Sequence, residues 1–154
     1  MSDIDRYEGI VERINARLRG CAGIADITTP GEDWSIKELV AHLVDSASNN
    51  HQRFIRLQQT EELVFPGYDA EEWRRISKAA GMDYMPLVDL WYSYNRYLLG
   101  IIARADPGAL ENVWISGDGR TSLGFLIEDY YAHLIWHEDL FIRIQDSIGA
   151  SRGS

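Results

Sequence analysis

Side chains in the last third of the chain recur with the period of an α-helix. The steps between these positions alternate strictly between three and four residues, which places them on one face of a helix. They are Leu123, Leu126, Tyr130, His133, His137, Leu140 and Ile144. Three further segments show the same period, so helices are predicted over about 4–18, 35–57, 86–105 and 121–148. The sequence therefore predicts an all-α fold, a four-helix bundle.

The segments between the predicted helices indicate their order in space. The first and last connections contain glycine, proline and turn dipeptides and are short enough to join neighbouring helix ends. The middle one, 58–85, is long enough to travel the length of a bundle, about 30 Å. We therefore expect up-down-down-up topology, with a long crossover between parallel second and third helices. A short helix capped by Asp69 and Glu72 is expected in the crossover, and a hairpin over Val113–Thr121.

Local signals fix two of the helix starts. Ser35 and Glu38 form a capping box, in which each side chain covers a backbone amide at the start of the second helix. Pro86 suits the first turn of the third, where a missing amide proton costs nothing.

Composition narrows the class of protein. The chain has 154 residues, 45% of them hydrophobic and 25% charged, which is typical of one globular domain spanning 1–154. A net charge of −9 and the lack of a basic patch argue against nucleic acid as a partner. We expect a soluble cytoplasmic protein without a membrane partner, because no apolar run approaches a membrane span and the N-terminus is acidic. Cys21 is single and has no activating neighbour, so it is not expected to be catalytic.

The histidines form the strongest functional pattern. His133 and His137 are four residues apart, so their rings lie one turn apart on one face of the last helix, and both are expected to face the bundle interior. On its own, such a pair is as compatible with one buried, hydrogen-bonded histidine beside an unrelated one as it is with a metal site. His42 lies about 9 Å from the start of the second helix, at a level that matches the pair if the two helices are antiparallel. The sequence therefore predicts a divalent-metal site made by His42, His133 and His137.

Three imidazoles leave at least one coordination position open, as in catalytic metal sites. Imidazole suits zinc, nickel, iron and copper, so the ligand set does not select the metal. His51 is nine residues from His42 and is expected on the far side of the helix, at the surface.

Several other side chains are candidates for the surroundings of the site. Asp45 and Asp129 lie within one turn of a histidine and could orient a ligating ring, or they could be ordinary solvated acids. Asn95 is a polar residue on an aromatic face of the third helix and is a candidate for substrate binding. The five tryptophans are expected to pack in the core or at an interface.

The sequence also resembles the DinB-like and YfiT-like metal-binding four-helix bundles. The resemblance rests on three motifs. They are the run from Trp34 to Asp45 followed by Arg53, the pair Asn95-Arg96, and the run from Thr121 to His137. It covers most of the chain, from about Ile4 to Ile148.

This resemblance implies the same bundle topology, a homodimer, and zinc, nickel or iron bound by residues matching His42, His133 and His137. Relatives include bacillithiol S-transferases and a mycothiol-dependent maleylpyruvate isomerase, which implies a low-molecular-weight thiol as cosubstrate. Arg53 could then hold a carboxylate of the substrate or thiol, although a surface salt bridge is the alternative. Some members carry a second histidine where this chain has Glu138, which leaves metal and substrate preference open.

Three functions remain compatible with the sequence. The first is a thiol-dependent S-transferase or isomerase acting on a small molecule. The second is a metal-dependent hydrolase using bound hydroxide, and the third is a non-catalytic metal-binding or stress-response module. No residue is assigned as the catalytic one.

Overall fold

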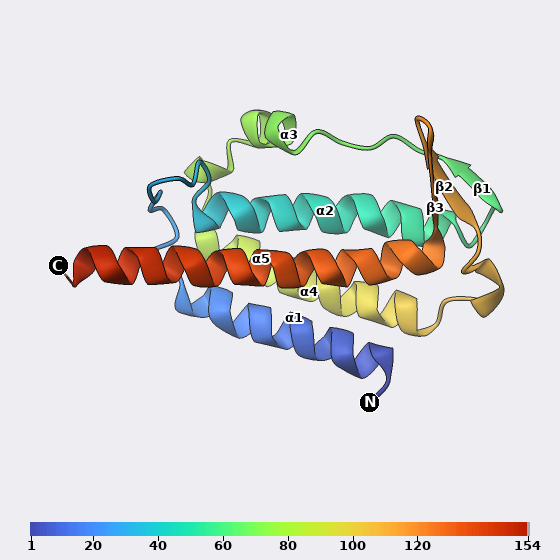
Figure 1. Ribbon diagram of the computed structural model, residues 1–154, viewed down its shortest axis with the longest axis horizontal. Helices are drawn as coiled ribbons and strands as arrows, with labels where there is room; N and C mark the ends of the chain where they lie inside the picture. The colour runs from blue at the N-terminus through green and yellow to red at the C-terminus, as the bar shows by residue number, and fades with distance from the viewer. Residues whose placement is uncertain (154) are drawn as a thin grey trace.

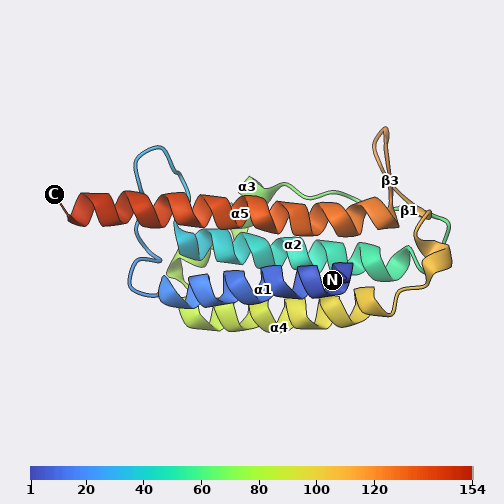
Figure 2. The ribbon, with the colours of Figure 1, turned by 60° about the horizontal axis from the view of Figure 1, so that its bottom comes forward.

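The computed structural model describes residues 1–153, and its four long helices lie side by side (Figures 1 and 2). The predicted all-α four-helix bundle is confirmed. These helices are α1 (Asp3–Gly20), α2 (Ile36–Arg56), α4 (Tyr84–Ala103) and α5 (Leu123–Arg152). Their ends lie within a few residues of the positions predicted from the periodicity.

Contacts between the helices fix their directions. Arg13 pairs with Glu138 and Arg17 bonds to Gln145, so α1 and α5 run in the same direction. Figures 1 and 2 show α2 and α4 running the opposite way, each from the C-terminal end of α5 towards its start. The helices therefore follow one another as up, down, down and up, with α2 antiparallel to α5.

The crossover between α2 and α4 lies along the outside of α2 (Figure 1). It contains β1 (Glu62–Val64), α3 (Ala70–Ser77) and the short 3-10 helix η1 (Ala79–Gly81). The expected cap is present, because the Asp69 side chain accepts hydrogen bonds from the amides of Glu71 and Glu72. Arg74 attaches α3 to α2 through a 2.6 Å ion pair with Glu38.

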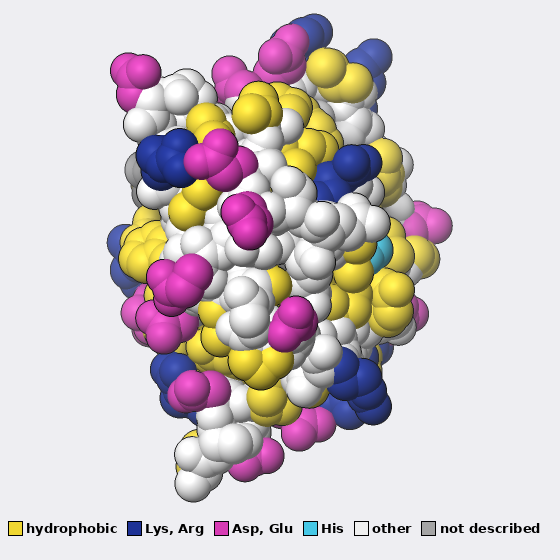
Figure 3. Space-filling view, turned by 90° about the vertical axis from the view of Figure 1, so that its right-hand side faces the viewer, with side chains coloured by type: hydrophobic (Ala, Val, Ile, Leu, Met, Phe, Trp, Pro, Cys, Tyr) yellow, Lys and Arg dark blue, Asp and Glu magenta, His cyan; other side chains and the backbone are white. Residues whose placement is uncertain are grey.

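A small sheet closes one end of the bundle. After the 3-10 helix η2 (Pro107–Ala109), the predicted hairpin forms from β2 (Val113–Ser116) and β3 (Gly119–Ser122). Gly117 has φ +58° in its turn, a conformation that favours glycine. Strand β1 adds to β2 in parallel, with Glu62 opposite Val113, and this pairing was not predicted. At this end of the molecule, acidic, basic and apolar side chains are intermixed on the surface (Figure 3).

The core lies between the four helices and includes most of the predicted apolar positions, together with Tyr131 and Phe141, which were not predicted. The largest fully buried side chains include Trp91, Tyr131, Phe54, Phe141 and Ile14. The predicted capping box at the start of α2 is present in both directions between Ser35 and Glu38. Among residues 1–153, every helix is too short or too polar to span a lipid bilayer.

Glu138 faces away from its neighbour His137, towards α1. Its carboxylate accepts hydrogen bonds of 2.8 and 2.7 Å from Nε and Nη2 of Arg13, and Arg17 lies 4.0 Å away. Only 5% of Glu138 is exposed, so the carboxylate of this ion pair is shielded from solvent. This residue therefore fixes α5 against α1 and does not contribute to the histidine cluster.

We expect Glu138→Gln to lower the free energy of unfolding by about 1–2 kcal/mol, because it removes one charge of a partly buried bidentate pair. Arg13 is half exposed and can regain water, which limits the loss. Urea denaturation gives the value, and Asp139→Asn, at the exposed neighbouring position, is the matched control. Equal stabilities of the two variants would contradict a structural role for the pair.

Candidate metal centre

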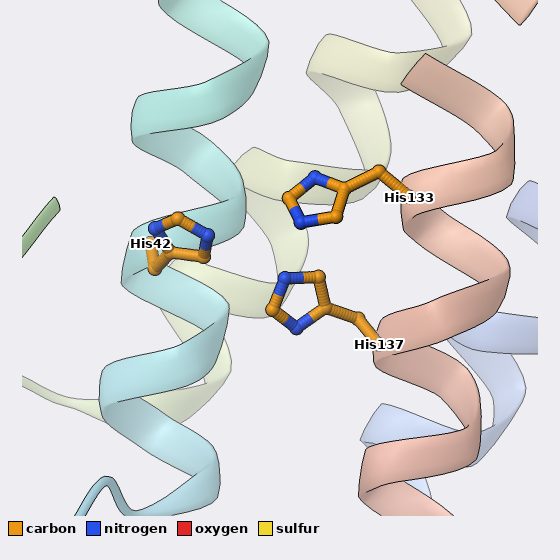
Figure 4. A group of neighbouring side chains, drawn as sticks. All are labelled: His42, His133 and His137. Carbon is orange, nitrogen blue, oxygen red and sulfur yellow. The ribbon is translucent and has the colours of Figure 1, made fainter. Parts of the chain in front are cut away.

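The three predicted histidines meet between α2 and α5 (Figure 4). His42 extends from α2, and His133 and His137 extend from successive turns of α5 towards it. One ring nitrogen from each lies within 4.8 Å of the others. The ring centres are 6.1 Å apart for His42 and His133, 5.1 Å for His42 and His137, and 4.6 Å for His133 and His137. The expected convergence is confirmed.

Burial differs strongly among the three rings. His137 is 3% exposed, His42 is half-buried and His133 is exposed. The prediction that His133 faces the bundle interior is therefore wrong. The buried face of α5 continues through Leu134 instead, because 3.6 residues per turn carry His133 to the edge of that face. The cluster consequently lies where the bundle interior meets solvent.

The buried imidazoles lack hydrogen-bond partners. Nδ1 of His42 and both ring nitrogens of His137 make no hydrogen bond within residues 1–153. Burial, together with the neighbouring histidines, lowers the pKa of His42 to about 4 and that of His137 to about 3. Burial also lowers the pKa of His133, although the charge of Asp129 opposes this. All three rings are thus neutral near pH 7, with lone pairs available to bind a cation.

The cluster forms one wall of a cavity of about 280 Å³. Trp34 contacts His42 edge-on, and Trp136 contacts both histidines of α5. Glu32 is the only charged side chain among the lining residues, and besides the neutral histidines the others are Trp34, Leu39, Ala70, Trp136 and Leu140. The arrangement offers neutral nitrogen ligands beside an apolar, aromatic space.

The two acids expected to orient the histidines do not do so in the structure. Asp45 cannot orient His42, because Nδ1 of His42 has no partner and Asp45 lines a separate cavity with Trp73 on α3. Asp45 faces α3 in the crossover instead. Asp129 is exposed and acts on His133 through its charge rather than through a hydrogen bond.

The substrate-binding candidates also lie elsewhere than expected. Asn95 is fully buried, donates to the Trp91 carbonyl at 2.9 Å and accepts from the Tyr130 hydroxyl at 2.7 Å. Its amide therefore bridges α4 and α5 and does not line the cavity. Arg53 is buried, with its guanidinium stacked on Trp114, so the alternative of a surface salt bridge is wrong.

Two residues near the cluster were not predicted. Glu32 reaches the cavity from the loop after Gly31, whose φ of +85° turns the chain there. Tyr68 comes from the crossover, and its ring centre is 6.4 Å from that of His42. Neither lies in a periodic segment, so the sequence held no signal for them. His51 is half-buried rather than at the surface, and its Nδ1 is 2.8 Å from the Tyr94 hydroxyl, away from the cluster.

Comparisons with known proteins bear on the fold. No protein-family model matches the chain. It is 28% identical over 85 residues to YfiT of Bacillus subtilis (strain 168), a protein proposed to be a metal-dependent hydrolase. That alignment covers 51% of this chain and 47% of YfiT, about half the length of each. The solved YfiT structure, described as an unusual four-helix bundle, matches 94% of this chain and 90% of its own with a TM-score of 0.70 at 19% identity. The two proteins therefore share their fold.

We expect the cluster to make the metal-free protein acid-sensitive. His137 has a folded-state pKa of about 3 against an ordinary value of 6.5. Between these values the unfolded state takes up a proton and the folded state does not, so stability falls as the pH decreases. From pH 6.5 to about 5 this costs roughly 2 kcal/mol.

Urea denaturation in the presence of a chelator measures this loss. The decrease should be smaller in His137→Gln, whose side chain does not titrate. Equal decreases in both proteins would show that His137 takes up its proton in the folded state.

Proposed function

We propose that this chain is a divalent-metal-dependent enzyme and that His42, His133 and His137 hold the metal. The observation that carries the proposal is the set of buried, neutral ring nitrogens without partners. Each unsatisfied buried polar atom costs roughly 1–3 kcal/mol, so gathering several of them at one point is unfavourable unless a ligand satisfies them. A cation bound by three imidazoles supplies that ligand.

A divalent ion held by these three histidines would lower the pKa of a bound water or thiol and would polarise a bound carbonyl group. The surrounding residues supply the rest of the site. Trp34, Trp136 and Leu140 offer apolar surface for the body of a small-molecule substrate. Glu32 is placed to accept a proton at its carboxylate oxygens or to bind a polar group of the substrate. The aromatic contacts hold the imidazole rings in place.

Hydrolysis is the reaction that we favour. The cavity borders solvent through the exposed ring of His133, which gives water access. The similarity to YfiT, itself proposed to be a metal-dependent hydrolase, supports the same reaction class.

Thiol transfer, or a thiol-dependent isomerisation, is the second candidate. It is favoured by the wall of Trp34, Leu39, Trp136 and Leu140, because an apolar space accommodates a hydrophobic electrophile. In this case a low-molecular-weight thiol is the cosubstrate. Cys21 does not supply the thiol, since it is fully buried and burial raises its pKa.

Removing a histidine ligand should greatly weaken metal binding. We expect His133→Ala and His137→Ala each to reduce the affinity for zinc by more than about a hundredfold, since even the loss of a supporting hydrogen bond costs tenfold to a hundredfold. Calorimetric titration of untagged protein measures this. His51→Ala is the matched control and should retain wild-type affinity. Equal affinities in all variants would place the metal elsewhere.

Turnover assays distinguish the two reactions. Hydrolysis predicts that the zinc-, nickel- or iron-loaded protein cleaves 4-nitrophenyl acetate without added thiol and that chelation abolishes this activity. Thiol transfer predicts consumption of 1-chloro-2,4-dinitrobenzene only when a thiol is added. In either case Cys21→Ser should retain nearly full activity. Full activity after chelation would contradict the proposal.

The homodimer and the cytoplasmic location stay predictions. Phe125, Ile135 and Trp136 are exposed apolar side chains of α5 that could lie in a dimer interface.

A further inference from the structure

Arg53 is a buried cation without a matching acid. It lies on α2 about three turns beyond His42, and only 6% of its surface is exposed. Its guanidinium carbon is 4.1 Å from the centre of the Trp114 ring, and Nη1 donates a long hydrogen bond of 3.4 Å to Asn50. Nε is buried and makes no hydrogen bond, and no ion pair within residues 1–153 includes this side chain.

Such an environment is unusual for arginine. Charged groups are almost never fully buried unless they are paired, because the loss of hydration must be offset. Stacking on an indole ring offsets part of that loss. The part of the lost hydration that stacking does not offset lowers the pKa of Arg53. An anion from outside the chain would complete the site.

The free part of the guanidinium has a defined shape. Trp114 covers one face of the guanidinium, and Oδ1 of Asn50 accepts a hydrogen bond from Nη1. This leaves the edge formed by Nε and Nη2, whose parallel N–H bonds match the two oxygens of a carboxylate. Lysine could not present such an edge.

The edge lies on the same side of α2 as the histidine cluster. Side chains on a helix lean towards its N-terminus, so Arg53 leans towards His42. Tyr68 adjoins both places, because its ring is 6.4 Å from that of His42 and its hydroxyl interacts electrostatically with Arg53.

We propose that the free edge of Arg53 binds a carboxylate group of the substrate, whose reactive end reaches the histidine cavity past Tyr68. Carboxylate binding by Arg53 does not depend on the proposed function, whereas the access of the reactive end to the histidine cavity rests on it. A singly charged carboxylate fits better than a phosphate dianion, because it matches the single positive charge of Arg53 and because the charge of Asp45 also acts near Tyr68. The substrate class is thus an elongated organic acid with its reactive group distant from the carboxylate.

Binding can be tested without metal or turnover. Glutarate is titrated into chelated wild-type protein, and binding is followed by tryptophan fluorescence, to which Trp114 contributes. Arg53→Gln should weaken glutarate binding by about tenfold or more, because hydrogen bonds to a charged group are lost. Arg53→Lys should bind with intermediate affinity. Arg56→Gln, an exposed arginine on the same helix, removes the same charge and should bind like the wild type.

Neutral glutaramide and inorganic phosphate complete the ligand set. The proposal expects no binding of glutaramide and weaker binding of phosphate than of glutarate. It is overturned if glutarate does not bind the wild type, if Arg53→Gln binds it equally well, or if phosphate binds more tightly. Should the variants fail to fold by circular dichroism, the nitrogen-15 resonance of Arg53 Nε in the wild type gives the answer, since it must shift with glutarate and not with glutaramide.

A pair of esters links this site to the cavity. In metal-loaded protein, Arg53→Gln should reduce kcat/KM for 4-nitrophenyl hemisebacate by about tenfold and leave 4-nitrophenyl acetate nearly unchanged. The ten-carbon acid is chosen because His42 and Arg53 are separated by roughly 16 Å along α2. Equal loss with both esters would contradict a carboxylate-binding role. If neither ester is cleaved by the wild type while glutarate still binds, the hydrolase proposal fails and the carboxylate site stands.

Discussion

The antiparallel contact between α2 and α5 determines what this molecule can do. His42 lies near the start of α2, and His133 and His137 lie near the middle of the longer helix α5. The three meet because α5 runs antiparallel to α2 and extends beyond its start (Figure 1). The rotation of α5 about its axis is equally constrained. Glu138 follows His137 directly, about 100° further around the helix axis, and is held by Arg13 of α1, so His137 is turned towards α2. The packing of the bundle thereby sets the direction of the imidazole rings.

Buried polar groups in this fold fall into two kinds. Asn95 satisfies its amide through Trp91 and Tyr130, and Glu138 satisfies its carboxylate through Arg13. These groups are complete within the chain and join one helix to another. The buried ring nitrogens of His137 and the Nε of Arg53 remain open. Nε1 of Trp91, the hydroxyl of Tyr131 and Nε of Arg17 are also buried without a partner, but they lie apart from one another. The histidine nitrogens differ because they gather at one point beside a cavity, where a ligand can satisfy them.

The sequence specified the helices and the histidine cluster because both depend on helical period. Spacings of three and four residues define one face of each helix and place His133 and His137 one turn apart, and antiparallel packing of α2 against α5 brings His42 opposite them. The placement of His133 at the edge of the interior could not be resolved, since neighbouring faces of a helix differ by a fraction of a turn.

Residues outside the helices escaped prediction for a different reason. Glu32 and Tyr68 reach the cluster through the path of a loop and of the crossover, and no local pattern encodes that path. Arg53 was identified, but its burial depends on Trp114 from the distant hairpin.

The parallel pairing of β1 with β2 has a consequence for the order of folding. Glu62 meets Val113, so the crossover is secured at that end only after much of the chain has been made. Closing so long a loop is entropically slow, and contacts of this kind form late. During synthesis, α1, α2 and α4 can associate while Arg53 still lacks its indole cover and His42 its two companions. The surroundings of Arg53 and the histidine cluster therefore form last, when the hairpin and α5 pack against helices that are already associated.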